Sequence, residues 1–124
     1  MKLKRLLMVE GLLSFGTGLL LTLLPGTTLG LYGLATNNSS IFMTQNAGGL
    51  YISLGLLALL ASNSSDLSTR KIIVRIFLVS HLVLILVAIR SQTMDNFDFQ
   101  LGWFSIFFEL LFSAAFGYFA RFEA

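Results

Sequence analysis

The sequence has no cysteine and little charge, and both shortages exclude classes of protein. Without cysteine the chain forms no disulfide, binds no metal through thiolate and carries no nucleophilic thiol. Charged residues make up 11% of its 124 positions, whereas a soluble domain carries about 25%. Apolar residues reach 56%, above the roughly 45–50% typical of soluble proteins. A soluble fold of this length lacks the interior to bury that much apolar surface.

Motifs that carry chemistry are lacking as well. The chain contains no glycine-rich phosphate loop, no His-Glu-x-x-His metal helix and no Gly-x-Ser-x-Gly nucleophile elbow. The eight lysine and arginine residues are too few and too dispersed for a nucleic-acid surface, although the net charge is +2. Nothing in the sequence therefore nominates an enzyme or a partner nucleic acid, and no particular cofactor is indicated.

Four long apolar runs fill most of the chain. Each is close to the roughly 20 residues that a helix needs to cross a hydrocarbon layer. They cover residues 6–24, 41–61, 72–89 and 101–120. Turn-forming and charged residues gather between them, at Pro25-Gly26, residues 36–40, residues 62–66 and residues 90–98. We therefore expect an all-α protein: a single four-helix bundle, residues 1–124, that lies in the lipid bilayer of a bacterial inner membrane.

The lysine and arginine residues predict the orientation of this bundle, because basic flanks stay on the cytoplasmic side. Seven of the eight lie inward if both termini and the second loop are cytoplasmic, and only Arg90 then lies outward. The first loop would face outward, and its leucines predict a short helix or segment at the interface. A cleaved signal peptide is the alternative for the first run, but Glu10 interrupts it and no small-x-small cleavage site follows.

Two ionisable residues near the cytoplasmic ends of the predicted spans form a candidate pair. Glu10 and Arg75 each lie about one turn beyond flanking basic residues, so they should share a depth. An intramembrane ion pair would satisfy both charges and fix how their two helices face each other. The alternative is that Arg75 extends to lipid headgroups while Glu10 reaches water or Lys4 and Arg5.

Three more polar residues, His81, Asn46 and Glu109, are candidates for binding a ligand. His81 lies near the middle of the third run, where imidazole could ligate a tetrapyrrole metal, shuttle protons or simply bond to a neighbouring hydroxyl or carboxylate. Glu109 is predicted in the outer half of the last run, near Asn46 and Arg90, either as part of a polar cluster or as a group that holds helices together.

A shared spacing links the first and last runs. Glu10, Ser14 and Gly18 are four residues apart, and so are Glu109, Ser113 and Gly117, so each set occupies one helical face. Small residues in such a stripe favour close helix packing in lipid. The last run is also rich in aromatic residues, which could contact lipid, a pigment, a quinone or another subunit.

The order of these features resembles the small four-helix bacterial membrane proteins of the DoxX-like kind. The resemblance rests on Pro25 at the end of the first run, Leu31-Tyr32-Gly33, Asn46-Ala47-Gly48-Gly49-Leu50, Leu54-Gly55-Leu56-Leu57 and a basic loop. It covers most of the chain and implies a fold and a membrane location, but no reaction. Many relatives carry arginine where this chain has Asn46, so no charged site is carried over.

Two functional interpretations follow. In the first, the protein is a structural or accessory subunit that packs against itself or against other subunits of a membrane complex. In the second, it is a binding or transport module whose polar residues surround a small hydrophobic ligand, a quinone or a pigment.

Overall fold

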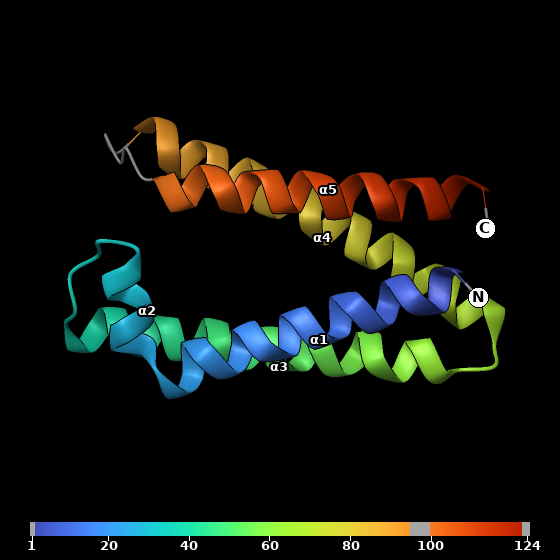
Figure 1. Ribbon diagram of the computed structural model, residues 1–124, viewed down its shortest axis with the longest axis horizontal. Coiled ribbons are helices and arrows are strands. Elements are labelled where there is room, and N and C mark those ends of the chain that lie inside the picture. Colours follow the sequence, from blue (N-terminus) through green and yellow to red (C-terminus); the bar gives the residue numbers. More distant parts are fainter. Residues whose placement is uncertain (1, 95–99, 123–124) are drawn as a thin grey trace. The chain divides into compact units, whose positions relative to one another are not determined.

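The computed structural model describes residues 2–94 and 100–122, and all regular structure in these ranges is helical. Figure 1 shows five helices in chain order. Their bounds are α1 Lys2–Leu23, α2 Pro25–Leu31, α3 Asn38–Asn63, α4 Leu67–Met94 and α5 Gln100–Phe122. Four of them, all except α2, are long and apolar enough to cross a membrane. The all-α class and the four long helices are thus confirmed.

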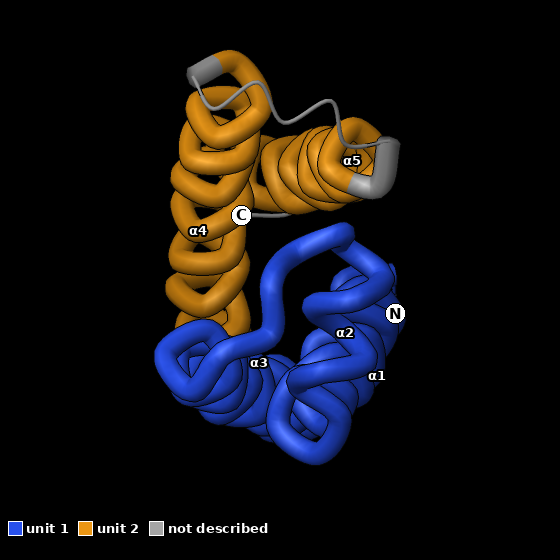
Figure 2. Tube along the Cα trace, turned by 90° about the vertical axis from the view of Figure 1, so that its left-hand side faces the viewer, with its two compact units in different colours: residues 1–64 blue, residues 65–124 orange. Residues whose placement is uncertain are grey.

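The chain divides into two compact units, residues 1–64 and 65–124, which Figure 2 shows in different colours. Unit 1 contains α1, α2 and α3, and unit 2 contains α4 and α5. Each is described by itself below. The single bundle that the sequence predicts stays a prediction.

In unit 1, α1 and α3 run antiparallel and meet through glycine (Figure 1). A methyl group added at Gly18 would lie 2.7 Å from the carbonyl oxygen of Gly48, and one added at Gly55 would lie 2.8 Å from that of Gly11. Both distances are far below van der Waals contact, so the two backbones touch where these glycines lie. A side chain at any of the four positions would force the helices apart.

The short helix expected in the first loop is present as α2, from Pro25 to Leu31, and its location at a membrane interface stays a prediction. Proline suits its first turn because the missing N–H has no partner within the helix there. After the helix ends at Leu31, Gly33 has a φ of 61°, and the N–H of Leu34 donates to the carbonyl of Leu29 at 2.9 Å. This is the hydrogen bond of a Schellman motif, which only a left-handed residue permits.

Polar caps extend α3 and α4 beyond the apolar runs. Asn37 Oδ1 accepts from the N–H of Ser40 at 2.8 Å, and Ser40 Oγ accepts from the N–H of Asn37 at 2.9 Å, which completes a capping box. Ahead of α4, the carboxylate of Asp66 accepts from the backbone N–H groups of Ser68 and Thr69, each at 3.0 Å, and from both their hydroxyls. These hydrogen bonds hold the pKa of Asp66 well below its usual range.

In unit 2, α4 and α5 form an antiparallel pair whose buried seam is filled by side chains (Figure 1). Phe77 of α4 and Phe116 of α5 are both at most 1% exposed, and their rings stack at 5.5 Å between centroids. Around them lie the other buried residues of the unit: Ile73, Val74, His81, Ile85, Ile106 and Ser113. The spacings of 74, 77, 81 and 85 are three, four and four, which place these residues on one face of α4.

Candidate functional site: a buried histidine and glutamate

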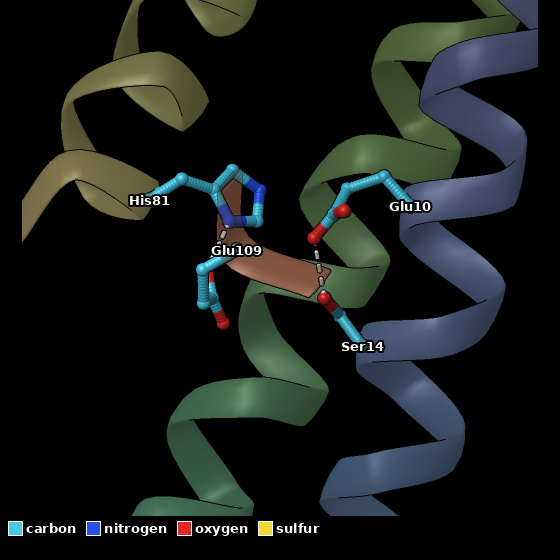
Figure 3. Close-up of polar contacts among 4 residues, drawn as sticks. All are labelled: Glu10, Ser14, His81 and Glu109. Atoms are coloured by element: carbon cyan, nitrogen blue, oxygen red, sulfur yellow. Dashed lines mark hydrogen bonds and ion pairs between the residues drawn. The ribbon is translucent and has the colours of Figure 1, made fainter. Parts of the chain in front are cut away.

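His81 and Glu109 are brought together by the helix pair of unit 2. His81 lies 14 residues into the 28-residue α4, close to its midpoint, and Glu109 lies near the midpoint of α5. Figure 3 shows the contact between His81 Nδ1 and Glu109 Oε2 as a dashed line. The side chains are 9% and 19% exposed, respectively. An ionised carboxylate can only accept, so the Nδ1–H of His81 donates to it.

Phenylalanine rings enclose the imidazole of His81. Its ring centroid lies 5.5 Å from those of Phe112 and Phe116, each at an interplanar angle of 19°, and 6.4 Å from that of Phe77. Such offset stacking holds the imidazole plane in one orientation. The surrounding rings also lower the local polarity, which strengthens the hydrogen bond to Glu109.

Ser113 extends this polar seam by one helical turn. It follows Glu109 by four residues, so it lies on the same face of α5, and it is 8% exposed. Its Oγ has no hydrogen-bond partner among the residues that the structure describes. Buried hydroxyls nearly always have a partner, so this oxygen is available to a ligand or to water.

Chemically, this arrangement can hold a proton and orient a hydrogen-bonding ligand. Imidazole can take up and release a proton, and the carboxylate of Glu109 can accept a hydrogen bond from it. The described residues contain no group of three or more histidine or acidic residues that could hold a metal ion by themselves. The structure thus brings the side chains of His81 and Glu109 into contact, but it does not identify a ligand for them.

Glu10 of unit 1 has a different partner, within its own helix. The hydroxyl of Ser14 donates to Glu10 Oε1 at 2.7 Å, as Figure 3 also shows, and Glu10 is only 4% exposed. Arg75, its predicted partner, lies in unit 2 with an exposed side chain. The Glu10–Arg75 pair therefore stays a prediction.

The remaining candidate, Asn46, lies on α3 in unit 1, where its side chain is exposed. Its Nδ2 donates to the carbonyl of Phe42, one turn earlier, at 3.0 Å. A polar cluster of Asn46 with Glu109 would span the two units and stays a prediction. Arg90, proposed for the same cluster, lies nine residues after His81, so it is about 13 Å further along α4.

The sequence contained a signal for the His81–Glu109 contact that residue types alone did not reveal. A carboxylate was among the expected partners of His81, but not this one. If the two helices are antiparallel, residues equally far from the predicted 90–98 loop lie side by side. His81 lies nine residues before this loop, which places it beside position 107, within one turn of Glu109. The stacking of Phe112 and Phe116 on His81 had no such signal, because phenylalanine occurs on every face of the last run.

Comparisons with known proteins add no relative: no family model, no curated protein and no solved structure matches the chain.

Proposed function

We propose that the protein crosses a membrane four times, through α1, α3, α4 and α5, with both termini and the 62–66 loop on the cytoplasmic side. The four long apolar helices support the spans, and the distribution of lysine and arginine supports the orientation. The DoxX-like resemblance and the bacterial inner membrane belong to the same proposal.

This topology is testable by labelling because the native chain has no cysteine. A single cysteine at Ser39 would report on the first turn of α3, and one at Ser65 would report on the loop before α4. In intact cells a membrane-impermeant maleimide should label Ser39→Cys but not Ser65→Cys until the membrane is opened. Equal labelling of both from outside would contradict the topology.

Within this topology, the protein acts as a membrane-embedded binding module for a small apolar ligand with a hydrogen-bonding group, such as a quinone or a pigment. The observation that carries this proposal is the His81–Glu109 contact near the helix midpoints. Ionisable side chains at membrane depth are costly, and they mark binding sites and proton pathways more often than they serve packing. Ser113, one turn from Glu109, offers a second polar group.

The direct test is to extract the protein from its own membrane in mild detergent and identify by mass spectrometry and absorbance whatever small molecule remains bound. His81→Leu should abolish retention of that molecule. The matched control is Glu10→Gln, which alters the buried acid of unit 1 and should leave retention unchanged. Wild-type protein that carries no small molecule, or equal loss in both variants, would contradict the binding module.

The second candidate function is that of an accessory subunit, packed against itself or against other membrane proteins. The observation that favours it is a set of large aromatic side chains exposed on α5: Trp103, Phe104, Phe107, Phe108, Tyr118 and Phe122. Aromatic residues are enriched where proteins bind each other. Stoichiometric partner chains in the detergent extract would support this function, and a clean monomer would oppose it.

A further inference from the structure

The first three turns of α4 carry Arg70, Lys71 and Arg75, of which Lys71 is half-buried and Arg75 is exposed. Lys71 and Arg75 are four residues apart, so they occupy neighbouring positions on one side of the helix. Two like charges at this spacing repel each other, which destabilises a helix unless an anion lies between or beside them. Within the described part of unit 2, neither side chain makes a hydrogen bond or an ion pair.

The acids of unit 2 that the structure describes are already engaged elsewhere. Asp66 accepts four hydrogen bonds from Ser68 and Thr69 at the start of α4. Glu109 contacts His81 further along the helix pair. Among the described residues of unit 2, no acid therefore remains to neutralise Lys71 and Arg75.

Helix geometry places both cationic groups near the start of α4. Side chains in an α-helix tilt toward its N-terminus, so the charged groups of Lys71 and Arg75 both lie closer to Leu67 than their Cα atoms do. The positive end of the α4 dipole adds to the potential there. Lys71 and Arg75 begin about 6 and 12 Å along the helix axis from Leu67, so both groups can reach the headgroup level if α4 spans a bilayer.

Beyond this pair, the exposed surface of α4 is apolar over several turns. Ile72, Ile76 and Val79 are 58%, 45% and 59% exposed, and Leu82, Val83 and Leu86 continue the strip. A cationic pair that leads into an apolar strip matches one kind of molecule, an amphiphile with a phosphate headgroup and long acyl chains. A soluble anion would use the cations and leave the strip unused.

We propose that Lys71 and Arg75 bind the phosphate headgroup of an anionic phospholipid whose acyl chain lies along the Ile72–Val79 surface of α4. The site requires a bilayer, but it depends neither on the ligand of His81 nor on which side of the membrane α4 begins.

The test uses the full chain in nanodiscs that contain equal amounts of phosphatidylglycerol and phosphatidylcholine. Native mass spectrometry counts the lipids that stay bound after release. Each cation near a membrane surface contributes about fivefold in affinity, so Lys71→Gln/Arg75→Gln should lower the preference for phosphatidylglycerol roughly 25-fold. The charge-preserving Lys71→Arg/Arg75→Lys should retain most of it, which separates lost charge from lost folding.

The matched control is Arg90→Gln, which removes an exposed cation near the other end of the same helix. Removing this single cation should lower the preference by no more than about fivefold, well short of the roughly 25-fold loss in the double variant. Three outcomes would overturn the proposal: wild-type protein without preference for the anionic lipid, an equal loss in Arg90→Gln, or an unchanged preference in the double glutamine variant. Displacement of the bound lipid by millimolar inorganic phosphate would instead assign the site to a soluble anion and overturn the lipid assignment.

Discussion

The same spacing of an acid, a serine and a glycine occurs in α1, at 10, 14 and 18, and in α5, at 109, 113 and 117, but the two helices pack differently. In unit 1 the glycines let the backbones of α1 and α3 touch, and Ser14 donates to Glu10 within α1. In unit 2 aromatic rings fill the space between α4 and α5. A methyl group added at Gly117 would lie 3.8 Å from its nearest neighbouring atom, which is ordinary van der Waals contact. Glu109 contacts His81 of α4. One residue pattern thus serves two kinds of helix pair.

The difference teaches which kind of change each pair tolerates. Where two backbones touch, as in unit 1, there is no room for added atoms, because no flexible side chain lies between the helices that could move aside. A seam made of rings has no replacement for lost atoms, because a cavity would remain between the helices. Substitutions that add atoms should therefore damage unit 1 most, and substitutions that remove atoms should damage unit 2 most.

The largest effect is expected from Phe116→Ala in unit 2. Phe116 is fully buried and stacks on both Phe77 and His81, so its removal should lower the free energy of unfolding by about 3 kcal/mol. Phe107→Ala on the same helix is the control, because Phe107 is 60% exposed, and it should cost less than about 1 kcal/mol. Unfolding in mixed detergent micelles measures both. Equal costs would mean that the α4–α5 seam is not filled as described.

Gly48→Ala should come next, and it probes unit 1. The added methyl group would lie 2.8 Å from the carbonyl oxygen of Gly18 and 2.8 Å from the N–H nitrogen of Thr22, so α1 and α3 must separate. We expect a loss of about 2 kcal/mol in the same unfolding assay. The adjacent Gly49→Ala meets no atom within 4 Å and should be neutral or slightly stabilising, since alanine favours helix. If Gly49→Ala were the more harmful change, the glycine contact would be wrong.

A smaller effect should distinguish the hydrogen bond of Glu109 from that of Glu10. In a double-mutant cycle, His81→Leu and Glu109→Leu should couple by about 1 kcal/mol, because their hydrogen bond joins two helices. Glu10→Leu and Ser14→Ala should couple by only about 0.3 kcal/mol, as side chains four apart on one helix do. The two cycles use the same unfolding assay, and similar coupling energies in both would erase the contrast between the acids.

The smallest effect concerns the N-terminal caps of α3 and α4, and it appears only at low pH. The folded-state pKa of Asp66 is lowered, so its contribution to stability is complete above the pKa of the unfolded chain, about 4, and is lost as the pH falls below that toward the folded-state value. The cap of α3 uses Asn37, which does not titrate. Amide hydrogen exchange, corrected for its intrinsic pH dependence, should therefore lose protection at Ser68 and Thr69 in acid but not at Ser40. Parallel loss at all three amides would implicate general acid unfolding instead.

The long helices were predictable because an apolar run of about 20 residues leaves the backbone few alternatives. The ends of these helices were less predictable, because each long helix begins or ends outside its apolar run. For example, α4 extends from Leu67 to Met94, whereas the apolar run covers residues 72–89. Hydropathy stops at the first polar residues, whereas hydrogen bonds from caps such as Asp66 and Asn37 carry the helix beyond them. Of the loop expected at residues 90–98, residues 90–94 belong to α4, and residues 95–98 lie outside the described residues.

The candidate site was predictable by residue type but not by pairing. His81 and Glu109 stood out because ionisable residues are rare in apolar runs. Which of them would meet depended on how α4 and α5 align, and that is set by rings such as Phe77 and Phe116 that fit together in only one register. The glycine contacts had a clearer signal in the small-residue stripe at Gly18, although their partner Gly48 was visible only in three dimensions.

The division of the chain into residues 1–64 and 65–124 also affects how it is made. Each unit is one continuous stretch, so the partners within it are near in sequence and contact order stays low. As synthesis proceeds from the N-terminus, α1 can meet α3 while α4 is still being translated. A nascent chain stalled once residue 64 has left the ribosomal exit tunnel should already display a protease-resistant helix pair.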